Sequence, residues 1–263
     1  MTNNSSQKLF IEVSMQNFSY CIKNQKSKQI IDFKTIPLDS FKAMDQQLDF
    51  IFDKETTLHS NFDDILVLHS NNLNTFIPEA LFDETALGSY LQYNVKVFPT
   101  DYFDFDTVEG LKMKNIYVPY VVFNNYFFDR FGSFDFQHIH TNLIQLLLTR
   151  SESENGKDFF VHIGKTHFEI VIFENNKLLF FNSYNYQTKE DFIYYILFVM
   201  EQLQLNPLEQ FVQLTGIINQ DSALYKIAYK YIKNVEITDL KPTAQAFPIE
   251  EKQLQEHYIL LQS

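Results

Sequence analysis

The sequence predicts an α/β fold in which a β-β-β-α-β-α-β unit occurs twice. Three observations support this prediction. Residues 158–238 alternate short apolar strands with helical stretches in that order. The N-terminal residues repeat the same order of strands and turns, and a polar stretch separates the two copies. A repeated order of this kind predicts two structurally similar halves.

The second copy is the clearer one. Its strands are predicted at residues 158–163, 168–173, 177–184, 209–216 and 234–238. Thr188 is a candidate N-cap because acidic residues follow it, and a second helix is predicted at residues 222–232. The first of these helices has apolar residues on several faces, Phe198 among them, so we expect it to be covered on two sides.

The first copy is found by placing Phe10 over Phe160 without gaps, which aligns a strand, a polar turn and a second strand. A shift of one residue in the alignment then places Lys28 over Lys177 at the start of a third strand. A helical stretch and a further strand follow at residues 38–52 and 63–69. The weak identity but shared spacing indicates an internal duplication.

Residues 70–114 are expected to form an insertion in the first half, with a helix after Pro78. A strand follows, and Pro119 fits the first turn of a helix that ends near Gly132.

The polar stretch at residues 150–158 predicts the boundary between a first half at 1–150 and a second half at 151–263. The polar tail ends in apolar residues, which we expect to dock on the body of the protein.

Composition restricts the class of partner. The 33 acidic residues exceed the 21 basic ones and give a formal charge of −12, which disfavours nucleic acid and anionic membranes as partners. The single Cys21 suits a reducing compartment, and the polar N-terminus is no signal peptide. The longest apolar run is too short for membrane insertion, so we expect a cytoplasmic protein.

The tripeptide Gly164-Lys165-Thr166 matches the end of a P-loop, but its surroundings do not. A P-loop requires another glycine five positions before this one, and Phe159 occupies that position. The residues after Thr166 alternate as a strand, whereas a P-loop leads into a helix. The sequence therefore predicts a hairpin turn here.

The duplicated unit resembles the RNase H-like, actin-like fold shared by actin, sugar kinases and Hsp70 chaperones. Closer still, it looks like the cytoplasmic actin-like proteins of type IV pilus assembly and type II secretion. The stretch KLLFFNSYNYQTKEDFIYYILFVMEQLQL at 177–205 also resembles a bacterial family known as domain of unknown function 3822. The resemblance implies a cleft between the halves, where members of the superfold hold ATP between two hairpin turns.

The first phosphate turn of the superfold maps onto Glu12, Ser14 and Gln16, together with the residues between and after them. Glu12 retains a carboxylate that could orient a water on Mg²⁺. The turn contains no glycine, whereas the superfold has one there.

The second phosphate turn maps onto His162, Gly164, Lys165 and Thr166. Its leading Asp is replaced by His162. The adenosine turn keeps Gly216 but loses the second glycine of the usual pair.

These departures favour a non-catalytic scaffold or adaptor that engages a protein partner or itself and needs no cofactor. The alternative is a protein that binds or hydrolyses Mg-ATP, with Gly164, Thr166 and Gly216 contacting the nucleotide.

Three other hypotheses are weaker. His138 and His140 are expected on one side of a strand, a spacing found in metal sites, but ordinary surface or hydrogen-bonded histidines are favoured. A nuclease using Glu12 is disfavoured by the charge, and Cys21 is better explained as a core residue than as a nucleophile. Residues 101–106 alternate acids with aromatics and are the best candidate for a binding surface.

Overall fold

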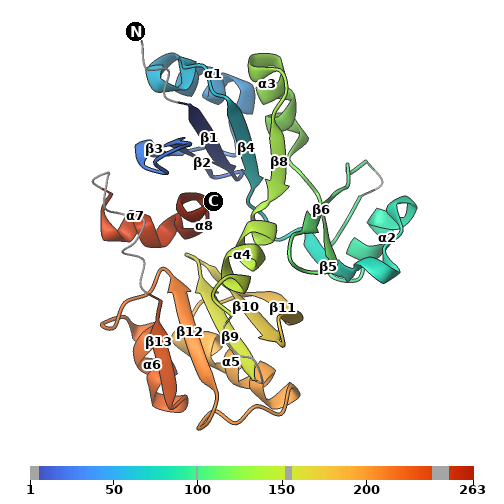
Figure 1. Cartoon of the computed structure of the whole chain (residues 1–263), viewed down its shortest axis with the longest axis vertical. Coiled ribbons are helices and arrows are strands. Elements are labelled where there is room, and N and C mark those ends of the chain that lie inside the picture. The colour runs from blue at the N-terminus through green and yellow to red at the C-terminus, as the bar shows by residue number, and fades with distance from the viewer. Residues whose placement is uncertain (1–5, 99, 152–155, 239–248) are drawn as a thin grey trace. The chain divides into compact units, whose positions relative to one another are not determined.

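The computed structural model describes residues 6–98, 100–151, 156–238 and 249–263. The chain divides into two compact units (Figure 1). The first extends to Leu143 and includes Ile259–Ser263, and the second comprises Ile144 onward and Ile249–Tyr258. The predicted boundary after residue 150 stays a prediction, and residues 152–155 of the polar joint lie outside the described residues. Within the described part of the chain, no helix combines the length and apolar character needed to cross a membrane.

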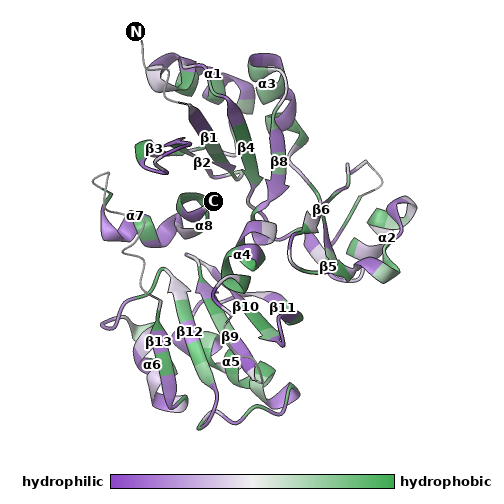
Figure 2. Cartoon of the chain, viewed as in Figure 1, coloured by the Kyte–Doolittle hydropathy of each residue, from purple (hydrophilic) through white to green (hydrophobic). Residues whose placement is uncertain are grey.

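The first unit contains a five-stranded mixed sheet in the order β3-β2-β1-β4-β8. Its strands are β1 (Gln7–Val13), β2 (Asn17–Asn24), β3 (Ile30–Pro37), β4 (Asp64–His69) and β8 (Asp135–His138). The first three strands are antiparallel, and β4 and β8 run parallel to β1. Strand β4 is hydrophobic along most of its length in Figure 2, as expected for a central strand.

Helices α1 (Met44–Lys54) and α3 (Val121–Phe131) pack on this sheet and share one hydrophobic core with it. The α3 helix ends at Gly132, as predicted. The predicted helix start at residue 38 is wrong, because Asp39 forms a turn instead. Its carboxylate accepts the backbone N–H of Phe41, and its own N–H donates to the side chain of Gln47.

The insertion between β4 and α3 is an antiparallel sheet in the order β5-β7-β6, with β5 (Asn74–Pro78), β6 (Asp104–Val108) and β7 (Met113–Tyr117). The long helix predicted after Pro78 is wrong. Two 3₁₀ turns occupy Glu79–Leu81 and Glu84–Ala86, and helix α2 covers only Leu87–Leu91. Asp83 caps the second of these turns by accepting the N–H of Thr85, and this local bond starts a new short element.

The second unit repeats the sheet in the order β11-β10-β9-β12-β13. Its elements are β9 (Lys157–Ile163), β10 (His167–Glu174), β11 (Lys177–Asn185), α5 (Lys189–Gln202), β12 (Phe211–Gly216), α6 (Ala223–Tyr231) and β13 (Asn234–Ile237). Both helices share one core with the sheet. Thr188 is the N-cap of α5 and forms a capping box with Asp191, which confirms the predicted helix start.

The internal duplication is confirmed strand by strand. Strands β1 and β2 coincide with β9 and β10 at a constant offset of 150, and their burial patterns are identical. Both copies have a register shift at the same place, after Ile22 and after Ile172. The predicted alignment shift of one residue before the third strand is wrong. Cys21 pairs with Phe33 and the equivalent Val171 with Phe181, so the second connection is two residues shorter.

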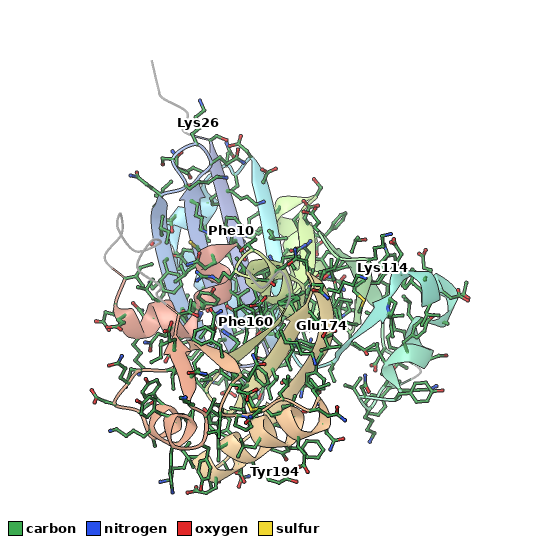
Figure 3. All side chains as sticks on the ribbon, turned by 60° about the horizontal axis from the view of Figure 1, so that its bottom comes forward. Phe10, Lys26, Lys114, Phe160, Glu174 and Tyr194 are labelled. Atoms are coloured by element: carbon green, nitrogen blue, oxygen red, sulfur yellow. The ribbon has the colours of Figure 1, made fainter. Side chains whose placement is uncertain are left out.

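One face of α5 is not covered as predicted. Tyr194 and Phe198 stack on each other and are 61% and 42% exposed. Figure 3 shows Tyr194 pointing away from the second unit. The apolar residues of α5 therefore exceed what one core can bury, and two of them remain in solvent.

Three further helices complete the structure: α4 (Ile139–Leu148), α7 (Glu251–Glu256) and α8 (Tyr258–Gln262). The chain passes from the first unit to the second within α4. The predicted docking of the C-terminal residues is confirmed, because Leu260 and Leu261 are buried. Lys23 donates to the backbone carbonyls of Leu261 and Ser263 at 3.1 and 2.8 Å, which satisfies the C-terminal end of α8.

Candidate functional site

The first candidate turn joins β1 to β2, and three of its backbone N–H groups, those of Ser14, Gln16 and Asn17, are bonded within the turn. Ser14 Oγ accepts the N–H groups of Gln16 and Asn17 at 3.2 and 3.0 Å. The Ser14 N–H in turn donates to the Asn17 carbonyl. Glu12 lies on β1, opposite Ser19 of β2 and Leu68 of β4. The Ser14 hydroxyl therefore accepts hydrogen bonds from amide N–H groups that a phosphate turn would offer to its ligand.

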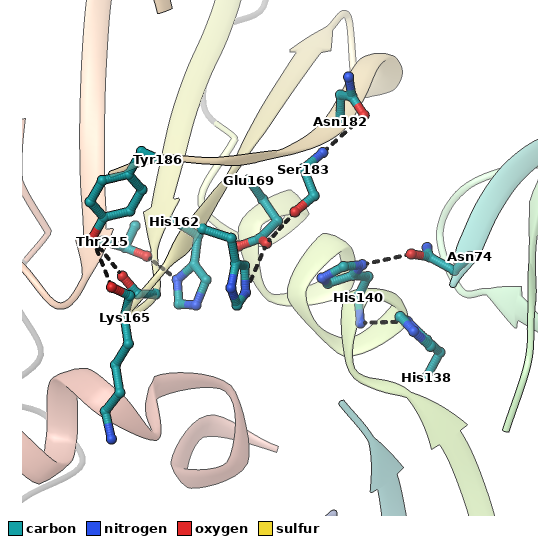
Figure 4. Close-up of polar contacts among 12 residues, drawn as sticks. Asn74, His138, His140, His162, Lys165, Glu169, Asn182, Ser183, Tyr186 and Thr215 are labelled. Atoms are coloured by element: carbon teal, nitrogen blue, oxygen red, sulfur yellow. Dashed lines mark hydrogen bonds and ion pairs between the residues drawn. The ribbon is translucent and has the colours of Figure 1, made fainter. Parts of the chain in front are cut away.

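The second candidate turn joins β9 to β10, so the hairpin predicted at Gly164-Lys165-Thr166 is confirmed. The Gly164 N–H donates to the His167 carbonyl, as Ser14 does to Asn17 in the first turn. The hydroxyl of Tyr186 donates to the carbonyls of Gly164 and Lys165 at 2.9 and 3.4 Å. This contact fixes the turn from its carbonyl side (Figure 4).

The side chains around the second turn contact the C-terminal segment of the same unit. The Lys165 ammonium lies 3.3 Å from the Glu256 carboxylate of α7, and Gln255 donates to the Ile218 carbonyl. The ring centroids of His162 and Tyr258 are 5.8 Å apart. Glu256 of α7 and Tyr258 thus contact two of the residues that the resemblance assigns to a nucleotide.

His162 also makes a contact across the sheet. Its Nδ1 lies 2.8 Å from the hydroxyl of Thr215, the residue paired with it on β12 (Figure 4). A leading Asp in this position would present a carboxylate, whereas His162 is engaged by a neighbouring hydroxyl and an aromatic ring.

Gly216 has a structural role that requires no ligand. Its φ is +81°, and a Cβ atom there would lie 2.3 Å from the carbonyl oxygen of Ile163. The next residue, Ile217, donates its N–H to the same carbonyl at 2.7 Å. Only glycine permits this approach of β12 to β9, so its presence does not by itself indicate an adenosine site.

The sequence-predicted residues therefore form two local groups. Glu12, Ser14 and Gln16 belong to the hairpin of the first unit. The hairpin of the second unit contains His162, Gly164, Lys165 and Thr166, with Gly216 at the end of the neighbouring strand.

The expectation that His138 and His140 share a strand is wrong. Strand β8 ends at His138, whose Nδ1 accepts the N–H of His140 in the first turn of α4. His140 Nδ1 lies 2.9 Å from the side-chain oxygen of Asn74 (Figure 4). Among the residues that the structure describes, no three His, Cys, Asp or Glu side chains are grouped to hold a metal ion.

A third histidine, His69 at the end of β4, pairs with His138 in the sheet. Its ring nitrogens contact the Asn124 side chain at 2.9 Å and the Tyr120 N–H at 3.2 Å. Burial lowers the pKa of His69 to about 4 and holds the pKa of His138 well below its usual range. Both rings are neutral at pH 7 and serve as hydrogen-bonding core residues.

Asp106 on β6 is the centre of the polar network that joins the insertion to β8 and α4. Its carboxylate accepts the His138 N–H at 2.8 Å and the hydroxyls of Thr141 and Tyr117 at 2.5 and 3.1 Å. Burial raises the pKa of Asp106 to about 6, against the opposing effect of these donors. The network holds the insertion on the first unit by buried polar contacts.

Sequence reasoning did not identify the residues that contact the second turn and its neighbours from elsewhere in the chain. Tyr186, Thr215, Glu256 and Tyr258 lie far from the turn at residue 164 along the chain, and no local motif marks them. One signal was available: the apolar end of the polar tail indicated that the C-terminus docks.

The two sheets, with the same strand order and the same register shift, define a protein with an actin-like ATPase fold. The chain belongs to the family described as protein of unknown function (DUF3822), whose model matches residues 1–235. Among curated proteins none matches the sequence.

The chain is similar to several solved structures, and the first two described below support the assignment of the fold. A protein from Bacteroides thetaiotaomicron, described as having an actin-like ATPase fold and unknown function, is 22% identical with a TM-score of 0.82. The match covers 100% of this chain and 98% of that one. The PilM–PilN complex of type IV pilus biogenesis matches with 13% identity and a TM-score of 0.63, covering 97% and 96% of the two chains. The cytoplasmic domain of EpsL from Vibrio cholerae, an inner-membrane component of the type II secretion system, is 10% identical with a TM-score of 0.46, covering 98% and 96%.

Proposed function

We propose that this protein is a non-catalytic scaffold or adaptor that engages a protein partner or another copy of itself, in the cytoplasm and without a nucleotide cofactor. The observation that carries the proposal is the bond of Ser14 Oγ to the N–H groups of Gln16 and Asn17. An ATP-binding turn needs such donors for the phosphate oxygens, and here a side chain of the turn itself takes them.

The second turn supports the same proposal. Lys165 is paired with Glu256, and His162 contacts Thr215 and Tyr258, so each of these side chains has a partner from the chain itself. A nucleotide would have to displace the contacts of α7 to reach them. One structure of this fold, PilM with PilN, is a complex with another protein, which is consistent with an adaptor role.

The test is a melting curve recorded with and without about 1 mM Mg-ATP. A ligand with a dissociation constant near 10 μM would stabilise the bound state by about 2.7 kcal/mol. For a chain of this size that corresponds to a shift on the order of 5–10 °C. We expect a shift below about 1 °C, and a shift of several degrees would refute the proposal.

The alternative function is ATP binding by the second turn. It is favoured by one observation: this turn keeps Gly164 and Thr166 and has no serine at the position of Ser14. Under this alternative, Glu256→Gln releases Lys165 and strengthens ATP binding, whereas Gly164→Arg abolishes it. Unchanged, undetectable ATP binding in both variants and the wild type would contradict the alternative.

A further inference from the structure

The insertion at residues 70–114 contains seven acidic residues and three lysines, which gives a formal charge of −4 out of −12 for the whole chain. Glu79 is paired with Lys114 of β7, and Asp106 is buried. The remaining acidic residues give the segment an excess of negative charge, which attracts a cationic partner.

The same segment contains a hollow of about 640 Å³ beside helix α2. Phe98, Tyr102 and Phe103 contribute aromatic walls, and Glu84 and Asp101 contribute carboxylates. The ring of Phe103 packs against Gly88 of α2, where an added Cβ would lie 3.0 Å from the ring. In Figure 3 the insertion is the part of the first unit marked by Lys114 of β7.

The aromatic walls are open to solvent. Phe98 is 52% exposed and Tyr102 is 55% exposed, although both are large side chains that a core would normally bury. The loop that presents them is held by Asp101, whose carboxylate accepts the Phe98 N–H at 2.7 Å and whose own N–H donates to the Phe98 carbonyl. Asp101, which precedes Tyr102 in the chain, is thus bonded twice to the backbone of Phe98.

The hollow has the chemistry that recognises a basic side chain. The Lys96 ammonium already lies 5.2 Å from the centre of the Phe98 ring, which shows that a cation is accommodated on this aromatic surface. Tyr102 donates to Asp104 at 3.5 Å, so its ring stands beside a carboxylate. The guanidinium of an arginine is a planar cation that can stack on an aromatic ring of the hollow, and its N–H groups can donate to the carboxylates. Apolar side chains next to that arginine in the partner segment would fill the rest of the hollow.

We propose that this hollow of the insertion, formed by α2 together with Val97, Phe98 and Asp101–Phe103, is a docking site for a partner-protein segment that carries an arginine or lysine next to apolar side chains. The inference rests on the proposed adaptor function, because it names the chemistry of the partner. The proposed docking site does not involve the two hairpin turns.

The test is a titration of the full ¹⁵N-labelled chain with a blocked Gly-Leu-Arg-Gly-Leu-Arg-Gly peptide, followed by NMR. We expect saturable shifts centred on residues 84–103 and none with the matching glutamate peptide. Glu84→Gln combined with Tyr102→Ser should weaken binding about fivefold or more, since each contact contributes roughly two- to fivefold. The matched control, Glu209→Gln combined with Tyr194→Ser in the second unit, should change it less than twofold.

Three outcomes would overturn the docking site: no saturation at millimolar peptide, shifts spread over both units, or equal weakening by both double variants. Spermidine binding as tightly as the peptide would also overturn it, because charge alone would then account for binding. The same labelled sample is titrated with Mg-ATP. Shifts at residues 164–167 with ATP would refute the proposed function and leave the peptide result intact, so the two failures are distinguishable.

Discussion

The hairpin turn at residues 14–17 and the one at residues 164–167 close equivalent strands of the two units, but they are stabilised differently. The first is held by its own serine, which accepts two backbone N–H groups. The second has glycine at that position and is held from outside by Tyr186 and by the pair of Lys165 with Glu256. Duplication preserved the backbone of the turn while its stabilising contacts diverged.

The two units also differ in the residue that ends the strand beside each turn. His69 ends β4 opposite Val13, and Gly216 ends β12 opposite Ile163. In both units the following residue donates its N–H to that opposite carbonyl, at 2.8 and 2.7 Å. The first unit uses a buried histidine there and continues into the insertion, whereas the second uses a left-handed glycine and continues to α6.

The largest expected effect comes from replacing the glycine that distinguishes the second unit. Gly216→Ala places a Cβ 2.3 Å from the Ile163 carbonyl at a φ of +81°, so we expect a loss of about 3–4 kcal/mol in the free energy of unfolding. Gly132→Ala is the matched control, since its φ is +77° but nothing lies within 4 Å of the added Cβ. We expect it to cost about 1 kcal/mol in urea titrations. Equal costs would show that backbone strain alone, and not the close approach of strands, requires Gly216.

The second prediction concerns pH and the polar network found only in the first unit. Burial raises the pKa of Asp106 from 3.8 to about 6, so its stabilising contribution is greatest below pH 4 and is lost as pH rises through 6. His69 has the opposite sign: burial lowers its pKa from 6.5 to about 4, so its contribution is lost as pH falls through that window. The two contributions oppose each other between pH 4 and 6.5.

Asp106→Asn removes the pH-dependent contribution of Asp106 and leaves that of His69. Between pH 6.5 and 4 we expect the variant to lose about 2 kcal/mol more unfolding free energy than the wild type does. Urea titrations across this pH range measure the slope, which is independent of any constant cost of the substitution. The exposed Asp221→Asn is the control and should follow the wild-type profile. Parallel profiles for Asp106→Asn would show that Asp106 does not titrate in this window.

The third prediction tests the internal serine of the first turn. Ser14→Ala leaves the N–H groups of Gln16 and Asn17 without their acceptor, and we expect a loss of about 1 kcal/mol. Thr166→Ala in the second turn is the control and should change stability by less than about 0.5 kcal/mol. Thermal melts of both variants provide the comparison, and a larger cost at Thr166 would reverse our account of the two turns.

The smallest expected effect on stability is at the ion pair of Lys165 with Glu256, which contacts the second turn, where glycine stands in place of the serine. Lys165→Ala should cost less than about 1 kcal/mol, because the lysine side chain is 65% exposed and water screens the pair. The cost should shrink in 0.5 M salt. Lys189→Ala, which removes a more exposed pair with Glu190, is the control and should have no measurable effect. A cost at Lys165 that does not respond to salt would indicate packing of its stem in place of ion pairing.

The elements that sequence analysis located correctly are those with local signals. Alternation and turn residues gave all five strands of the second unit, and Thr188 gave the start of α5. The errors occur where a side chain redirects the backbone. Asp39 and Asp83 form local turns that end a helical pattern early, and the ring of His138 caps the helix that follows its strand. Their effect depends on geometry that residue type does not reveal.

Composition, alternation and the repeat by themselves determined the α/β class, the duplicated unit and the absence of a P-loop, because these depend on periodicity along the chain. Only the tertiary structure decided which distant side chains contact each candidate residue. Glu256 lies 91 positions after Lys165, and Tyr258 lies 96 after His162. Asp106 contacts residues up to 35 positions away. Such contacts are made by folding, since the sheet brings distant segments to one place, and no local pattern encodes which side chains will meet.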